Sequence, residues 1–194
     1  CFYFSNAKNE IMGNAASGGV FGFAFPNLDD PIGEFSSVED TPKDYSNKLF
    51  DGNSCHSAGW MWRMSGCIYF GGRLNQNGNT LSYTSGRSNR GGENTMTNTL
   101  ISLSSRAISH WGRNPRVFGY ESYDNVRGGG AIFGIAKMRD ALIVGYSNNP
   151  AAWPMSRSGA PNGYYEAFQF YDTSQTTLLS GLTIRNFLSE HPRV

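Results

Sequence analysis

Short apolar segments of three to six residues alternate with clusters of Gly, Asn and Ser along the whole chain, as at Val20–Phe25 and Ala141–Val144. The segments are rich in β-branched and aromatic residues and are bounded by turn-forming residues, which is typical of strands. They are much shorter than the ~20 apolar residues that cross a bilayer as a helix. The pattern therefore predicts an all-β chain with no membrane span in this segment.

Asparagine recurs four residues after the apolar residue near the end of several of these segments, as in Leu49 to Asn53. Asn14 and Asn53 are 39 residues apart, and Asn148 and Asn186 are 38 apart. Such a repeat suits a propeller blade, one long coil or two shorter coils of a solenoid. In a parallel β-helix, Asn tolerates the left-handed turn between strands and can hydrogen-bond from one coil to the next. A β-sandwich remains the alternative at this point.

Two stretches interrupt the rhythm of strands. Residues 27–47 form an acidic, proline-containing stretch, and residues 75–99 are dominated by Asn, Gly, Ser and Thr, with Arg87 and Arg90 among them. We expect both to be loop insertions that project from one solenoid segment spanning residues 1–194. We also expect that segment to be an excerpt of a longer multidomain chain.

The amino-acid composition argues against two classes of binding partner, nucleic acids and acidic membranes. Gly, Asn and Ser make up a third of the chain, charged residues only 16%, and the net charge is +1. An aromatic content of 14% supplies a core, which argues against disorder. The near-zero charge argues against binding to nucleic acid or to an acidic membrane.

The chain has three cysteines, Cys1, Cys55 and Cys67. Cys55 and Cys67 are close enough in sequence to form a disulfide, which would leave the partner of Cys1 outside this segment. Zinc is the alternative for Cys55 and the adjacent His56, but no second pair of ligands accompanies them. We therefore expect no metal and no cofactor, and the cysteines favour an extracellular setting.

Four blocks in order resemble one extracellular protein family. They are Asn14–Gly19 with the aromatic segment after it, Phe50–Gly59, Asp124–Gly129 and Ala167–Asp172. The family that they resemble contains the cell-surface and cell-migration-inducing hyaluronidases and the fibrocystin-like proteins. The resemblance implies a right-handed parallel β-helix in a large secreted or membrane-tethered protein. It does not place that family's catalytic positions in this chain.

Candidate catalytic groups are few. A glycosidase needs two carboxyl groups about 5–9.5 Å apart. Asp29 and Asp30 are sequence neighbours that we interpret as solvated loop charges. Asp124 and Asp172 could meet on neighbouring coils, although aspartates more often cap turns. His56 is a candidate general base, with a structural role in contact with an adjacent coil as the favoured alternative.

Trp60 and Trp62 lie on one face of a predicted strand. They would form either a platform on which a sugar ring stacks or a ladder within the core. Both interpretations remain open.

The leading hypothesis is an extracellular or cell-surface structural or adhesive β-helix segment. It would contact neighbouring domains, subunits or glycans. The alternative is a polysaccharide hydrolase of the hyaluronan type, which the family resemblance suggests.

Overall fold

A computed structural model of the chain describes residues 1–60, 65–84, 93–111, 114–126, 131–132, 136–147, 166–170 and 176–187. Within these ranges the chain forms strands and two short 3₁₀ helices, η1 (Gly33–Phe35) and η2 (Pro42–Asp44), and no α-helix. A seven-stranded sheet holds β1 (Phe2–Tyr3), β4 (Phe21–Asn27), β7 (Gly66–Asn77), β10 (Ile108–His110), β12 (Ala131–Ile132) and β14 (Gln169–Phe170), with β8 (Thr80–Thr84) beside β7.

The eight-stranded sheet holds the remaining strands. They are β2 (Glu10–Met12), β3 (Ala15–Ser17), β5 (Leu49–Asp51), β6 (Ser54–His56), β9 (Glu93–Ser102), β11 (Asn114–Tyr123), β13 (Lys137–Val144) and β15 (Leu178–Arg185). All of its strand pairs are parallel, and in the other sheet only the β7–β8 pair is antiparallel. The predicted all-β class with parallel strands is confirmed, and the face-packed antiparallel sandwich is wrong.

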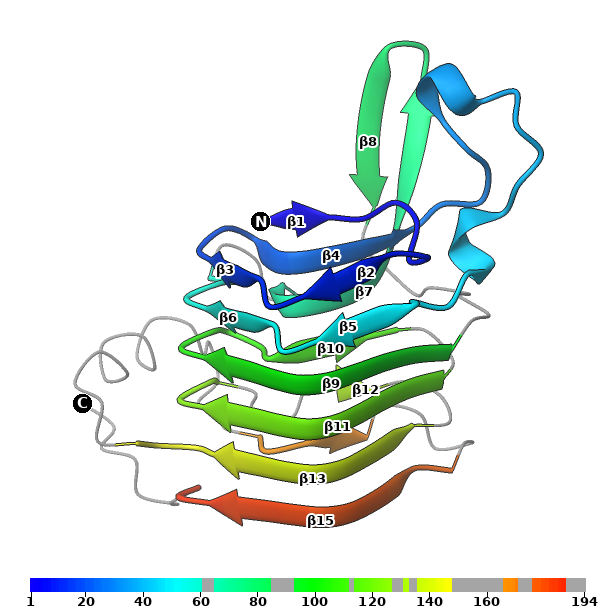
Figure 1. Cartoon of the computed structure of the whole chain (residues 1–194). Helices are drawn as coiled ribbons and strands as arrows, with labels where there is room; N and C mark the ends of the chain where they lie inside the picture. The colour runs from blue at the N-terminus through cyan, green and yellow to red at the C-terminus, as the bar shows by residue number, and fades with distance from the viewer. Residues whose placement is uncertain are drawn as a thin grey trace.

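The chain passes back and forth between the two sheets, so that each passage adds one row to the stack (Figure 1). The length of a passage varies. Ser104 contacts the residue 21 positions later on the next row, whereas Asn14 contacts the residue 39 positions later. The longer step contains the 27–47 stretch. The row itself is therefore short, and some rows carry an inserted loop. A row with such an insertion accounts for the spacing of about 38 residues between asparagines in the sequence.

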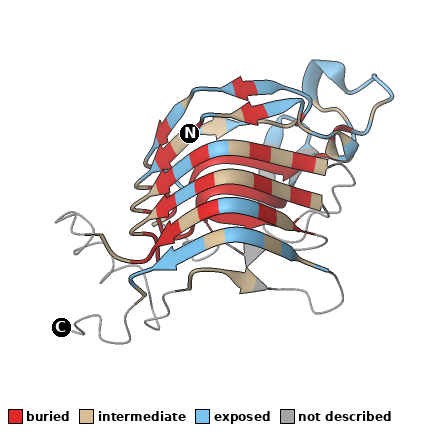
Figure 2. Cartoon of the chain, turned by 60° about the horizontal axis from the view of Figure 1, so that its bottom comes forward, coloured by how far each residue is buried: buried red, intermediate tan, exposed pale blue. Residues whose placement is uncertain are grey.

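In-register pairing places like residues above one another in the core. The central inward column of the eight-stranded sheet contains the buried residues Ile11, Phe50, Met96, Val117 and Met138. Figure 2 shows the same alternation of buried and exposed positions along successive strands. Apolar side chains thus fill the space between the sheets, row by row.

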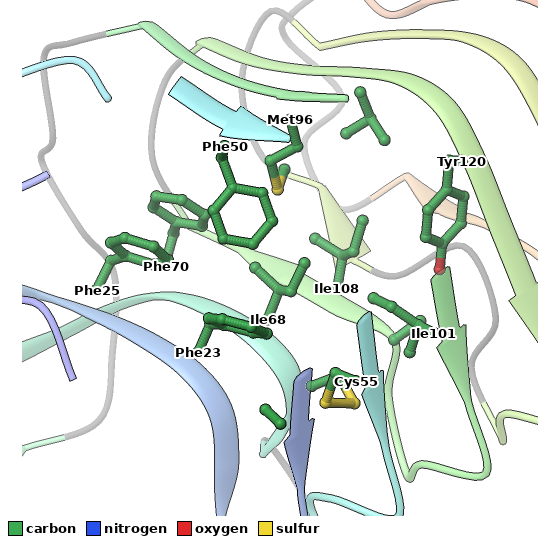
Figure 3. Close-up of a cluster of buried hydrophobic side chains, with 14 of the residues drawn as sticks. Phe23, Phe25, Phe50, Cys55, Ile68, Phe70, Met96, Ile101, Ile108 and Tyr120 are labelled. Atoms are coloured by element: carbon green, nitrogen blue, oxygen red, sulfur yellow. A yellow bond between two sulfur atoms is a disulfide. The ribbon is translucent and has the colours of Figure 1, made fainter. Parts of the chain in front are cut away.

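Aromatic rings stack from row to row on the inner face of the seven-stranded sheet. Phe4 stacks on Phe25 at 5.1 Å, Phe25 on Phe70 at 4.2 Å, and the tilted ring of His110 lies 4.6 Å from Phe70. Phe50 approaches the ring of Phe25 edge-on from the facing sheet (Figure 3). Offset and edge contacts of this kind add to the stabilisation from burial alone.

Asparagine does join neighbouring rows, as the sequence predicts. Asn53 accepts hydrogen bonds at Oδ1 from the backbone and the side chain of Asn14, at 3.0 and 3.1 Å, and its Nδ2 donates to the Ile11 carbonyl. Buried Asn125 repeats this arrangement against Ser104. Asn186 instead lies just beyond the end of β15, so it does not belong to the Asn14–Asn53 column. Asn148 lies outside the described residues.

A second column runs through the bend of the eight-stranded sheet and has left-handed backbone geometry. Its members have φ between 49° and 63° and are Gly13, Gly52, Asn98, Gly119, Asp140 and Gly181. Asn98 Oδ1 would lie 2.7 Å from a Cβ at Gly119, and Asp140 Oδ1 would lie 2.7 Å from one at Gly181. Each of the two non-glycine side chains is therefore followed, one row further along the stack, by a glycine that leaves room for it.

The two expected insertions differ in form. Residues 27–47 leave the stack between β4 and β5 and carry η1 and η2. In the second, residues 75–84 extend β7 and form β8, so this part is a hairpin. Glu93 already begins β9, a strand of the eight-stranded sheet. The expected boundary at residue 99 is therefore wrong, because Thr95, Thr97 and Thr99 are strand residues and not loop residues.

A disulfide joins Cys55 of β6 to Cys67 of β7, and Cys1 is free and exposed. The bond lies in the core between the two sheets, with both cysteines almost fully buried (Figure 3). A Cβ at Gly22 would lie 2.3 Å from the Cys55 Sγ. Only glycine fits at this point of β4.

The left-handed column gives a direct test of the stack. Gly119→Ala should lower the free energy of unfolding by about 2–4 kcal/mol, because it adds backbone strain and a clash with the Asn98 side chain. Gly13→Ala is the matched control, since it has φ of 63° and nothing within 4 Å of the new Cβ. It should cost only the backbone strain, about 1–2 kcal/mol.

Chemical denaturation measures both variants. Asn98→Gly alone removes the hydrogen bond from Asn98 Nδ2 to Asp51 Oδ1 and is the reference for the double variant. In the Asn98→Gly background, Gly119→Ala should cost only about as much as Gly13→Ala costs in the wild type. Equal losses for the two single variants would contradict the contact between Asn98 and Gly119.

Candidate functional site

A cavity of about 480 Å³ lies where the 27–47 stretch faces the hairpin of β7 and β8. Its walls come from two segments far apart in the sequence. The lining residues are Leu28, Asp29, Asp30, Pro31, Ile32, Ser36, Arg73, Asn75 and Gly78. Its volume lies within the ~300–1,000 Å³ usual for small-molecule sites.

The hairpin wall extends out of the stack because β7 continues beyond its parallel partner. Asn27, the last residue of β4, pairs with Arg73, and from Arg73 onward β7 pairs with β8. The two-residue turn begins with Gly78 at φ of 57°, a position where glycine is favoured in tight hairpins. Arg73 therefore stands at the base of the cavity, where the sheet and the hairpin diverge.

Asp29 ties the two walls together. Its Oδ1 lies 2.6 Å from Lys43 Nζ and its Oδ2 lies 2.5 Å from the Arg73 guanidinium. The hydrogen bond from Lys43, assisted by the charges of Lys43 and Arg73, lowers the pKa of the Asp29 carboxyl below its ordinary value. The same hydrogen bond raises the pKa of Lys43. Both cations thus neutralise Asp29. Lys43 does so within the loop itself, and Arg73 of β7 joins the loop to the hairpin.

A second hollow of about 550 Å³ adjoins the first and shares Asp30 with it. It is lined by Asp30, Glu39, Asp40, Thr41, Asp44 and Tyr45. The Tyr45 hydroxyl donates to Asp40 Oδ1 at 2.5 Å, and this bond raises the pKa of the phenol. Because four of its six lining residues are acidic, the second hollow is strongly negative, whereas the first is lined by residues of both charges.

Asp124, a predicted catalytic candidate, occupies a left-handed corner with φ of 56°. Its Oδ1 accepts from the Ser147 backbone at 2.6 Å, and its Oδ2 accepts from the Ser147 hydroxyl at 2.5 Å. Both carboxylate oxygens therefore join one row to the next, which is the structural role weighed above for aspartate. Asp172, the proposed partner of Asp124, lies outside the described residues.

His56 is exposed at the end of β6, with Nδ1 3.1 Å from the hydroxyl of Ser57. Because β9 lies between β6 and β11, His56 and Asp124 are two strand spacings apart, about 10 Å. They form no local pair.

Trp60 is half-buried and its Nε1 donates to the Leu103 carbonyl at 3.2 Å. Trp62 lies outside the described residues, so the tryptophan platform stays a prediction.

No group of three or more His, Cys, Asp or Glu side chains is placed to hold a metal ion within the described part of the chain. The same part contains no helix long and apolar enough to cross a membrane.

Sequence reasoning interprets Asp29 and Asp30 as loop charges and misses Lys43, Arg73 and Asn75 as their neighbours. One signal is present in the sequence, since Lys43 is the single cation among six acidic residues between positions 27 and 47. Nothing in the sequence indicates that Arg73, which is 44 positions beyond Asp29, approaches the same loop.

The fold places this chain among all-β proteins of the β-helix type, built from stacked parallel strands. Residues 1–61 match the sequence profile of the CEMIP beta-helix family. Two G8 domain-containing proteins of Dictyostelium discoideum are each 42% identical to the chain, over 98% and 96% of its length. Protein rliB of the same organism is 39% identical over 96% of the chain.

The chain spans only 14% of each of the two G8 domain-containing proteins and 18% of protein rliB. No solved structure matches it. These matches support a relation to CEMIP and G8 domain-containing proteins, and the activities of those much longer proteins do not transfer with it.

The contacts of Asp29 predict a pH-dependent contribution to stability. Asp29→Asn should lower the stability by about 1 kcal/mol or less at pH 7, because the ion pairs are partly exposed. The folded-state pKa of Asp29 is depressed, so its contribution is complete above the ordinary value of 3.8 and is lost as the pH falls below it.

Melting temperatures of wild type and Asp29→Asn should therefore differ at pH 7 and converge below pH 3.8. Glu34→Gln changes a charge in the same loop outside the cavity lining and should leave the melting temperature unchanged. A difference between wild type and Asp29→Asn that persists at low pH would contradict the proposed ion pairs.

Proposed function

We propose that this chain is a section of a right-handed parallel β-helix in an extracellular or cell-surface protein. It mediates contacts with neighbouring domains, subunits or glycans. Alternation between two parallel sheets supports the closed solenoid, and parallel crossovers in proteins are almost always right-handed. The disulfide supports the extracellular setting, and the match of residues 1–61 to the CEMIP beta-helix family supports the β-helix. A hyaluronidase-like or fibrocystin-like parent protein is the part of this proposal that rests on the resemblance of the four sequence blocks alone.

The observation that best supports this proposal is the exposure of Ile184, a residue of β15 at a position that is buried in other rows. In one inward column Cys55, Ile101, Ser122 and Ile143 are all at most 2% exposed, whereas Ile184, which pairs with Ile143, is 49% exposed. A core column that ends on an exposed isoleucine favours an additional strand over β15. None of the described strands pairs with the outer edge of β15, and in this proposal the additional strand comes from a longer chain or from a second subunit.

Substitution of Ile184 tests this contact. Ile184→Lys should leave the melting temperature of the chain nearly unchanged, because the side chain is already half exposed. It should weaken association of the chain with itself or with its parent protein, as measured by sedimentation velocity. Thr183→Lys adds the same charge at the adjacent exposed position and is the matched control. Equal association of both variants and wild type would overturn the proposed contact.

The alternative function is hydrolysis of a polysaccharide of the hyaluronan type. The match to the CEMIP beta-helix family favours it. Against it, both oxygens of Asp124 already bind Ser147, so that carboxylate is committed to the fold.

Sizing of polymers separates the two functions. We expect hyaluronan and neutral polysaccharides to keep their length when incubated with the full-length protein. Shortening that disappears in Asp172→Asn would contradict the structural role and support the enzymatic one. Asp124→Asn tests the other candidate carboxyl group in the same assay. The backbone should be undisturbed in this variant, because Asn tolerates the left-handed conformation of residue 124.

A further inference from the structure

We propose that the outer face of the eight-stranded sheet binds a second copy of this chain, with the two stacks antiparallel. The outer face comprises the two outward columns that precede the bend, one through Arg116 and the other through Phe118. Its strands are β2, β5, β9, β11, β13 and β15, which lie side by side in Figure 1. This inference rests on the proposed contact role and deepens it, because it names the partner and the surface.

Charge is distributed unevenly along the chain. Residues 1–60 contain eight acidic and three basic residues, a net charge of −5, whereas residues 61–194 contain seven acidic and thirteen basic residues, a net charge of +6. The six strands of the outer face stack in sequence order. An uneven distribution along the sequence therefore favours opposite charges at opposite ends of the stack.

The outer face follows this distribution. Glu10 of β2 and Asp51 of β5 lie on its N-terminal rows, whereas β13 presents Lys137 and Arg139. Asp51 accepts hydrogen bonds from neutral side chains of β9, and Arg139 lies over the ring of Phe118 at 4.4 Å. None of the four charged residues forms an ion pair within the described part of the chain. Their charges are therefore not compensated by a neighbouring charge.

The sign of the charge changes at the middle of the face. There Glu93, at the start of β9, lies 2.6 Å from the Arg116 guanidinium of β11, so these two charges neutralise each other. The acidic strand β5 and the basic strand β13 lie one row away from this pair, on opposite sides. The face is consequently acidic on one side of its midline and basic on the other.

Two copies of such a face can meet about a two-fold axis in two ways. An axis parallel to the stack places every row opposite the same row of the second copy, so that Asp51 faces Asp51 and Arg139 faces Arg139. An axis parallel to the strands reverses the stack and places β5 opposite β13. In the second arrangement Asp51 faces Arg139 of the second copy, and symmetry makes the contact twice. Electrostatic complementarity therefore selects the antiparallel arrangement.

The charges at the margins of the face agree with this choice. Lys48 precedes β5, and Asp140 lies at the bend of β13. In the antiparallel arrangement they would face the uncharged residues Ala136 and Gly52 of the second copy. In the other arrangement each would face its own equivalent, which adds two further repulsive contacts.

Apolar side chains and the size of the face indicate a weak dimer. Met12, Leu49 and Leu178 are 56%, 37% and 51% exposed at outward positions of their strands. Six strands about 4.8 Å apart, with four or five residues each, give a contact of roughly 400–500 Å² per copy. The total of just under about 1,000 Å² is typical of transient complexes. We therefore expect a reversible dimer with a dissociation constant on the order of 10 µM.

Sedimentation velocity of the 194-residue chain over a range of concentrations tests the proposal. The dissociation constant of the wild-type dimer should rise with added NaCl, because salt screens the charges. Asp51→Arg and Arg139→Asp should each raise it about tenfold or more, because each places like charges opposite one another at both symmetric contacts. An equimolar mixture of the two variants should recover the wild-type affinity as a heterodimer, since opposite charges then face each other at both contacts.

Glu34→Arg reverses a charge in the 27–47 stretch, away from the outer face, and should dimerise like wild type. A wild-type chain that stays monomeric, charge variants that associate like wild type, or a mixture that does not recover would each overturn the proposed dimer. Asp51→Arg also loses its hydrogen bonds to β9. If melting curves show that it has lost its fold, the effect of Arg139→Asp decides.

The dimer and the end contact at Ile184 can be separated in the same assay. Ile184→Lys does not change the outer face. Association that is lost in Ile184→Lys and kept in both charge variants would support the end contact and overturn the dimer. Association that is lost in the charge variants and kept in Ile184→Lys would support the dimer and overturn the end contact.

Discussion

In-register hydrogen bonding between parallel strands is the constraint on which the rest of this structure depends. Once Phe25 pairs with Phe70, and Phe70 with His110, the three rings have to stack. The same registration aligns the buried column that contains Phe50 and the left-handed column that contains Gly119. Residues at equivalent positions thus share one environment. A substitution in one row should affect the packing of the two neighbouring rows first.

The strand class and the use of asparagine between rows could be predicted from the sequence, because both depend on local patterns. The register could not, since the rows differ in length and the spacing between Asn14 and Asn53 includes an excursion. Asn186 illustrates the difficulty. It follows an apolar segment just as Asn53 does, yet it lies beyond the end of its strand, where spacing alone misplaces it. The start of β9 is not predictable either, because its Thr and Asn residues resemble those of a loop.

The candidate site was less predictable than the fold. Asp29, Lys43 and Arg73 meet only because a long loop and a hairpin leave the same edge of the stack and face each other. Ion pairs of this kind depend on three-dimensional placement and leave no periodic signal. Asp124 is the opposite case. It carries a suitable functional group, and its surroundings use that group to hold the backbone of the next row.

The position of the disulfide has a mechanical consequence. Cys55 and Cys67 lie on strands that follow one another along the chain and belong to different sheets, so the bond closes a single row. Among the described residues it links no strand to the one stacked on it. Tension along the stacking direction is therefore resisted by backbone hydrogen bonds between rows and by side-chain packing, with no disulfide between rows in the described part of the chain. A chain loaded in this way would extend by releasing rows one after another from an end.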